Sequence, residues 1–197
     1  DVYKRQVRCV ILTGAGSAFS AGGNIKAMQE GRAPFGGLGA HIADSYRQGI
    51  HRIIRSIWQL EVPAIAAVNG PAIGLGNDIT SLCDIRIAAK SAIFGATFLK
   101  IGLIPGDGGA WLLPRQIGLS RASELLFTGK TIAAETAAEW GLVSEVVDDD
   151  ALMATARAMA GSRRGVDDLV GRDMAAGCPA REVVYVAAAG GRPSAEL

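Results

Sequence analysis

The sequence has little of what metal-binding, disulfide-rich and membrane-spanning proteins need. Its 197 residues include only 2 His and 3 Cys, and Cys9, Cys83 and Cys178 form no C-x-x-C pair. We therefore expect no metal site and no disulfide framework, which favours a reducing, cytoplasmic setting. The apolar stretch 62–79 is interrupted by proline, asparagine and aspartate, so it does not predict a membrane-spanning helix.

Charge of one sign is also missing, because 20 basic and 19 acidic residues leave a net charge of +1. This balance predicts neither a nucleic-acid nor a membrane partner. Hydrophobic residues make up 49% of the chain, which is typical of a globular domain with its own core. We expect that domain at 7–160 and truncated at its N-terminus. Residues 1–6 (DVYKRQ) read like translated adapter DNA, and 161–197, with its scattered glycines, reads as an atypical tail, either disordered or frameshifted.

Buried strands and amphipathic helices alternate along the predicted domain. Residues 8–13 and 64–69 are apolar runs without polar alternation, which is typical of strands buried on both faces. Residues 41–60 carry isoleucines at helical spacing and predict one long helix that Pro63 closes. This pattern predicts an α/β fold with a mostly parallel sheet. Further strands are predicted at 85–89, 92–94 and 143–147, and further helices at 24–30, 77–83, 121–127 and 133–140, with a last one capped at 148–150 and running to 159.

Two glycine-rich turns, 14–23 and 70–76, each follow a predicted buried strand and lead toward a helix. Such turns expose backbone N–H groups that can bind an anion or a developing oxyanion. Two ordinary strand-to-helix turns that need glycine for their backbone conformation would read the same way. A dinucleotide-binding G-x-G-x-x-G fingerprint is disfavoured because position 19 is Phe19.

Four segments together resemble the enoyl-CoA hydratase/isomerase (crotonase) family. They are AFSAGGNIKAM at 18–28, NGPAIGLGNDITSLCDIRIA at 69–88, FGATFLKIGLIPGDGGAWLLPR at 94–115 and FTGKTIAAETAAEWGLVSEVV at 127–147, in the family's order and spacing. The resemblance implies a spiral of β-β-α units that assembles as a homotrimer or hexamer. It also implies an acyl-CoA substrate, with coenzyme A as part of the substrate and no separate cofactor.

The same resemblance implies a thioester oxyanion held by two backbone N–H groups, those of Ala21 and Leu75. Asn24 departs from the Asp that is more usual at its position. The residues implied to contact substrate or coenzyme A are Ala21, Gly22, Gly23, Asn24, Ile25, Lys26, Leu75, Gly76 and Phe98.

The acid/base groups depart from the pattern of the hydratases that the chain resembles. Those enzymes use two glutamates, and here the matching positions hold Asp78 and Phe98. A second carboxylate, Asp107, lies one residue after Gly106, the position that matches the acid of isomerising relatives. Asp78 and Asp107 are therefore the candidate catalytic residues. Asp78 can also simply complement a helix dipole, and Asp107 can be a turn residue.

Isomerisation needs only one base that removes and returns a proton, whereas hydration must also activate water. Because Phe98 cannot move a proton, an isomerase-type proton shuttle is favoured over an enoyl-CoA hydratase. A hydrolase or dehalogenase with an aspartate nucleophile, and a non-catalytic CoA-binding homologue, are the alternatives. Other predictions assign Asp84 a structural hydrogen bond, Phe98 and Trp111 to pocket wall or core, and His41 and His51 to the surface or an interface.

Overall fold

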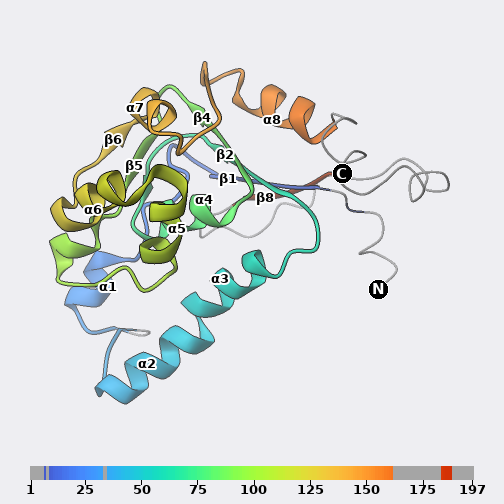
Figure 1. The fold of residues 1–197 in the computed structure, drawn as a ribbon. Coiled ribbons are helices and arrows are strands. Elements are labelled where there is room, and N and C mark those ends of the chain that lie inside the picture. The colour runs from blue at the N-terminus through green and yellow to red at the C-terminus, as the bar shows by residue number, and fades with distance from the viewer. Residues whose placement is uncertain (1–6, 8, 33–34, 162–182, 188–197) are drawn as a thin grey trace.

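The computed structural model describes residues 7, 9–32, 35–161 and 183–187 of the chain. Strands and helices alternate through most of it (Figure 1). The strands are β1 (Cys9–Thr13), β2 (Ala64–Val68), β3 (Ala72–Ile73), β4 (Ile85–Ala89), β5 (Ile93–Gly95), β6 (Ile132–Ala133), β7 (Glu145–Val147) and β8 (Val183–Ala187). The helices are α1 (Ile25–Gln29), α2 (Gly39–Gln48), α3 (Ile50–Trp58), α4 (Leu75–Leu82), the 3-10 helix η2 (Thr97–Ile101), α5 (Gly109–Ile117), α6 (Leu119–Thr128), α7 (Ala134–Glu139) and α8 (Leu152–Gly161).

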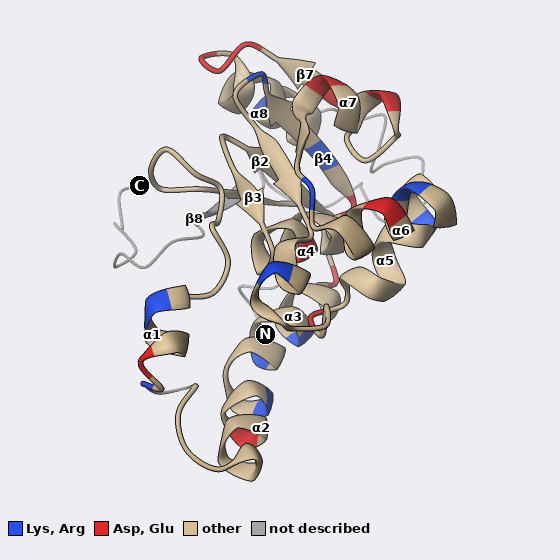
Figure 2. Cartoon of the chain, turned by 90° about the vertical axis from the view of Figure 1, so that its left-hand side faces the viewer, with Lys and Arg blue, Asp and Glu red and all other residues tan. Residues whose placement is uncertain are grey.

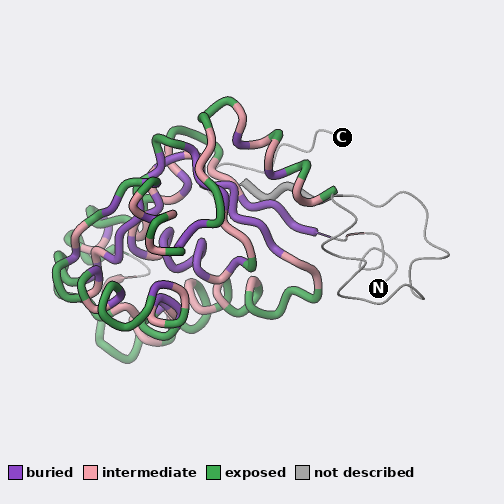
Figure 3. Tube along the Cα trace, turned by 45° about the horizontal axis from the view of Figure 1, so that its top comes forward, coloured by how far each residue is buried: buried purple, intermediate pink, exposed green. Residues whose placement is uncertain are grey.

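The larger sheet is parallel throughout, with strand order β7-β4-β2-β1-β8. Two of its inner strands, β1 and β2, are buried on both faces, as their unbroken apolar runs predict (Figure 3). Ile11 and Ile65 pack toward α8 on one face, whereas Leu12 and Val68 face the cluster that includes α4 on the other. The predicted α/β fold with a mostly parallel sheet is therefore confirmed.

A smaller sheet, β3-β5-β6, pairs β3 with β5 in parallel and β5 with β6 antiparallel. Each of its first two strands follows a strand of the larger sheet, so the chain runs β2-β3-α4 and then β4-β5 into η2 and α5. This is the β-β-α repeat that the crotonase resemblance implies. The repeat brings the start of α4 and the η2–α5 segment to the same end of the molecule as the loop after β1 (Figure 1).

The prediction of one helix over 41–60 is wrong, because the structure has two helices that meet at Gly49. The Gly49 backbone (φ −107°, ψ −91°) leaves the helical region, and its N–H donates to the Ser45 carbonyl at 2.9 Å. Glycine is among the poorest helix formers, so the break falls where helix propensity is lowest. Neither α2 nor α3 contains a buried residue, and Ile53 (47% exposed) and Trp58 (60% exposed) keep much of their surface in solvent (Figure 3).

Helix α5 was not predicted, because its two leading glycines and Pro114 favour a loop when the sequence is read alone. Strand β8 was not assigned either; it lies in the segment 161–197 and pairs in parallel with β1. The remainder of that segment beyond Gly161, and residues 1–6, lie outside the described residues, so the predictions made for them stay predictions.

Charged residues of both signs are spread over the outer helices and loops (Figure 2). Among the described residues, no helix combines the length and the apolar character needed to cross a membrane.

Candidate functional site

The two glycine-rich turns lie against each other. Ser20 N–H donates to the Pro71 carbonyl at 3.1 Å, and the Ser20 carbonyl accepts from Ile73 N–H at 2.9 Å. Helix α4 then packs so closely on the first turn that a Cβ added to Gly76 would lie 2.2 Å from the Ser20 oxygen. Only glycine fits there, so Gly76 allows the close approach of the turns and lines none of the cavities described below.

Asn69, at the end of β2, ties the first turn to the sheet. Its side-chain oxygen accepts from Gly14 N–H at 2.8 Å, and its amide nitrogen donates to the Gly16 carbonyl at 2.7 Å. The start of the 14–23 turn is thereby fixed on the strand that leads into the second turn. Sequence analysis did not assign this role, although an Asn directly after a buried strand is a signal that could have suggested it.

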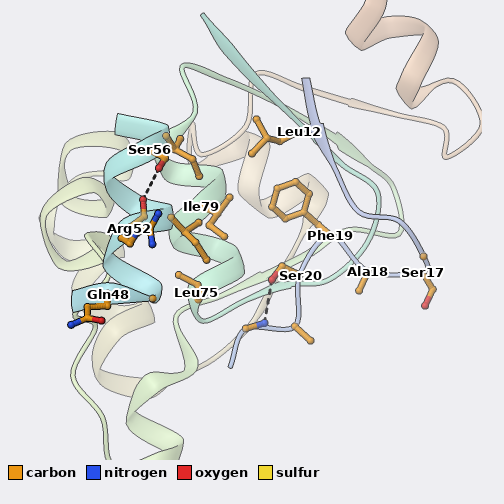
Figure 4. A pocket seen from close by; sticks show the side chains of 16 residues that line it. Leu12, Ser17, Ala18, Phe19, Ser20, Gln48, Arg52, Ser56, Leu75 and Ile79 are labelled. Atoms are coloured by element: carbon orange, nitrogen blue, oxygen red, sulfur yellow. Dashed lines mark hydrogen bonds between the residues drawn. The ribbon is translucent and has the colours of Figure 1, made fainter. Parts of the chain in front are cut away.

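Ala21 and Leu75 come from different turns and line the same two cavities. The larger cavity, of about 970 Å³, lies between the 16–22 segment, α3 and α4 (Figure 4). The smaller one, of about 190 Å³, contains Phe98 and Asp107 in its lining. A Cβ added to Gly22 would lie 3.5 Å from the Leu75 nitrogen, so the two turns are in close contact here. Within the described residues, neither the Ala21 N–H nor the Leu75 N–H donates to a protein acceptor.

Asp78 lies in the first turn of α4 and is fully buried. Its Oδ2 accepts from the Gly109 N–H at 3.2 Å, and its Oδ1 has no hydrogen-bond partner in the described part of the chain. A Cβ on Gly109 would lie 2.2 Å from Oδ1, so glycine is required where α5 begins. Burial raises the pKa of Asp78 to about 7, the negative charge of Asp107 adds to the rise, and the Gly109 hydrogen bond opposes it.

Asp107 lines the smaller cavity and is 5% exposed. Burial raises its pKa above the ordinary value, and the proximity of His51 opposes that rise. Its charge in turn contributes to a raised pKa of the Tyr46 phenol, for which burial is the larger cause. The two candidate carboxylates are thus close enough to interact, but Asp107 lines the cavity and Asp78 lies behind it, against α5.

The remaining predicted substrate contacts divide into two groups. Gly22, Gly23, Ile25 and Phe98 line the smaller cavity. Asn24 and Lys26 line neither that cavity nor the larger one. The Asn24 side chain caps α1 by accepting from an N–H of its first turn at 3.0 Å, and the Lys26 side chain is 78% exposed.

The structure tests three further predictions, those for Asp84, Phe98 and Trp111. Asp84 is confirmed as a structural residue, since its Oδ2 accepts from Ala64 N–H at 2.8 Å. Phe98 is confirmed as pocket wall. Trp111 was placed in the pocket wall or core, and this is wrong: it is 51% exposed and its ring contacts Trp58 edge-on at 5.7 Å.

The role of Tyr46 was missed. His51, assigned to the surface or an interface, lies beside it with ring centroids 6.1 Å apart. Tyr46 lies in α2 and His51 in α3. The spacing of apolar residues predicts these helices but not which way their side chains face. In the part of the chain that the structure describes, no three His, Cys, Asp or Glu side chains gather in a way that could hold a metal ion.

Comparison with known proteins gives a consistent picture. The family model described as enoyl-CoA hydratase/isomerase matches residues 3–163. The chain is 42% identical over 155 residues to the 1,2-epoxyphenylacetyl-CoA isomerase of Escherichia coli, covering 78% of this chain and 58% of that protein. It is 42% identical over 161 residues to the short-chain-enoyl-CoA hydratase of Clostridium acetobutylicum, covering 79% and 57%.

Among solved structures, an enoyl-CoA hydratase from Bacillus anthracis matches with a TM-score of 0.70 and 41% identity, over 78% of this chain and 57% of that one. A putative enoyl-CoA hydratase from Streptomyces coelicolor matches with a TM-score of 0.73 and 34% identity, over 83% and 58%. The chain therefore spans less than two thirds of the length of these relatives.

Proposed function

Because the chain belongs to the enoyl-CoA hydratase/isomerase family, we propose that the whole protein acts on an acyl-CoA thioester and moves a proton on its acyl chain. The observation that carries this proposal is one cavity lined by Ala21, Leu75 and Asp107. Two backbone N–H groups that have no acceptor among the described residues, together with a buried carboxylate, supply what an enolate-forming reaction needs. We also expect the whole protein to assemble as a trimer or hexamer, which light scattering would measure.

The N–H groups of Ala21 and Leu75 are the proposed oxyanion hole. They have no protein acceptor in the described residues, and the turns that carry them are fixed by the Ser20 hydrogen bonds and by the close approach at Gly76. Donors that are already oriented stabilise the enolate oxygen without reorganising during the reaction. The thioester oxygen would lie between the two N–H groups, with the acyl carbons extending toward Asp107.

Asp107 is the proposed base, because it lines the cavity. For isomerisation it removes a proton from the carbon next to the thioester of a 3-enoyl-CoA and returns that proton to the far carbon of the resulting dienolate. The product is the conjugated 2-enoyl-CoA, and no water is consumed. Asp78 lies behind Asp107 with a pKa near 7, so we assign it to the electrostatics of the site and to fixing the start of α5 through Gly109.

Hydration of a 2-enoyl-CoA is the second candidate. It is favoured by the presence of two interacting carboxylates and by a relative named as a short-chain-enoyl-CoA hydratase. Against it, Phe98 places an aromatic ring in the cavity wall. A third possibility, a non-catalytic CoA-binding homologue, would bind acyl-CoA thioesters and convert neither substrate.

The test follows the absorbance of the conjugated thioester with two substrates. Isomerisation of a 3-enoyl-CoA raises this absorbance and hydration of crotonyl-CoA lowers it. We expect the first reaction to be faster, and Asp107→Asn to slow it by about 10²-fold or more, since general-base catalysis contributes roughly that much. Asp44→Asn is the matched control, because Asp44 is an exposed carboxylate that pairs with Arg47 at 3.0 Å on α2. Unchanged isomerisation in Asp107→Asn would refute the assignment, and efficient hydration of crotonyl-CoA would favour the hydratase.

A further inference from the structure

The smaller cavity adjoins a third one, of about 510 Å³, that reaches the helices α1 and α2. The third cavity adds Gln29, Phe35 and Ile42 to the lining. Six residues line both spaces, namely Ile25, Met28, Tyr46, Lys100, Ile101 and Leu103. The site therefore extends from Asp107 past Tyr46 toward an end walled by Phe35 and Ile42.

This extension is suited to an uncharged, apolar group. Aliphatic, thioether and aromatic side chains make up most of its lining, and among the described residues that line it there is no Asp or Glu. Its one cationic residue, Lys100, is exposed, and the stem of Lys100 packs against Gly129, where an added Cβ would lie 3.3 Å from the Lys100 Cγ. Apolar surface of this kind favours a hydrocarbon over a polar ligand.

The position of Asp107 indicates which part of the substrate enters the extension. The reacting carbons belong to the acyl group and must lie beside Asp107, so the acyl group enters the smaller cavity, which Asp107 lines. The smaller cavity alone, at about 190 Å³, is below the range of roughly 300–1,000 Å³ typical of small-molecule sites. A site made of both cavities falls within that range.

Tyr46 lies where the two cavities meet. Its ring contacts Phe35 and His51 edge-on, each with ring centroids 6.1 Å apart, so neighbours on both sides hold it in place. Burial and, to a smaller extent, the charge of Asp107 raise the pKa of its phenol above the ordinary value. Tyr46 thus forms a fixed wall between the reacting carbons and the apolar end.

Because the two cavities adjoin and share six lining residues, we propose that the substrate carries a long or broad apolar acyl group of more than four carbons. The far end of this group occupies the space between Met28, Phe35 and Ile42, beyond Tyr46. This inference rests on the proposed function and names its substrate class. Tyr46 and Ile42 are the specificity-determining residues in this arrangement.

Binding of non-reacting saturated thioesters tests the proposal without requiring turnover. Isothermal titration compares butanoyl-CoA, which the smaller cavity can hold, with octanoyl-CoA, which needs the extension. Each buried methylene favours binding roughly fourfold, so octanoyl-CoA should bind at least about tenfold more tightly. Ile42→Trp fills the extension and should abolish this preference while leaving butanoyl-CoA affinity within about twofold.

Arg47→Trp is the matched control, because Arg47 is an exposed residue of the same helix and lines none of the three cavities. It should leave the preference intact. If Ile42→Trp does not fold, Gln29→Trp fills the same space from α1, because Gln29 also lines the third cavity and not the smaller one. An octanoyl-CoA preference that is absent, or that survives both filling variants, overturns the inference while butanoyl-CoA binding still supports the proposed function. If neither thioester binds, both the inference and the proposed function fail.

Discussion

Replacing Asp78 by Asn should stabilise the folded protein at pH 8 much more than at pH 5. The folded state disfavours the Asp78 carboxylate, because burial raises its pKa to about 7 from an ordinary 3.8. A group whose pKa is raised on folding favours the folded state while it is protonated, and this contribution is lost as the pH rises through the folded pKa. The loss therefore begins near pH 4 and is complete just above pH 7. An Asn has the same shape and stays neutral throughout.

The magnitude follows from the two pKa values. Between pH 5 and pH 8 the penalty for ionising Asp78 grows by about 2.5 kcal/mol, and the stability advantage of Asp78→Asn should grow by the same amount. For a chain of this size this corresponds to roughly 5–10 °C in Tm. The hydrogen bond from Gly109 can be kept, because the Asn side-chain oxygen can take the place of Oδ2.

Thermal unfolding followed by circular dichroism at both pH values measures the difference between variant and parent. Taking the difference removes every group whose titration does not depend on the charge of Asp78. Asp44→Asn serves as the control, since its carboxylate lies in solvent on α2 and its removal should have the same small effect at both pH values. If the stability difference between Asp78→Asn and the parent does not grow with pH, burial does not raise the pKa of Asp78 in the folded protein, and the reasoning is refuted.

Three further outcomes are expected. Gly109→Ala should lower the free energy of unfolding by about 1–3 kcal/mol in urea titrations, because its Cβ would lie 2.2 Å from Asp78 Oδ1; an unchanged midpoint would contradict that contact. His51→Gln should shift the acidic limb of the pH–rate profile to higher pH, because the proximity of His51 lowers the pKa of Asp107 and only the ionised base accepts a proton. A shift to lower pH would exclude this effect of His51 on Asp107. Asn69→Ala should cost about 1–3 kcal/mol and make the 14–23 turn more sensitive to proteolysis, because three hydrogen bonds to that turn are lost, and equal digestion rates would argue against this role.

The strands of the core were well predicted, for a physical reason. β1 and β2 are buried on both faces, so nearly every residue must be apolar and the signal is local. The glycines that follow these strands are equally clear in the sequence, because few other residues fit a tight turn or a close approach of two backbones. Local signals failed where a helix is held by tertiary packing, as in α5, whose Gly109 and Pro114 read as a loop.

The candidate site shows the same division. The sequence identified four candidate residues, Ala21, Leu75, Asp78 and Asp107. It did not indicate that three of them line the smaller cavity and that Asp78 does not. Asp107 and Asp78 looked equivalent because a carboxylate's distance from solvent depends on which distant segment covers it. Here α5, which begins 31 residues after Asp78, supplies the Gly109 N–H that binds Asp78 outside the cavity lining.

The sequence by itself determined the parallel α/β core, the two glycine-rich turns and the family to which the chain belongs, because those features depend on short apolar runs and on residues close together along the chain. Only the tertiary structure decided that the helix predicted over 41–60 breaks at Gly49 and that Tyr46 lines two cavities. It also decided which aspartate lines the site. These outcomes depend on contacts between segments tens of residues apart, where packing and desolvation outweigh local propensity.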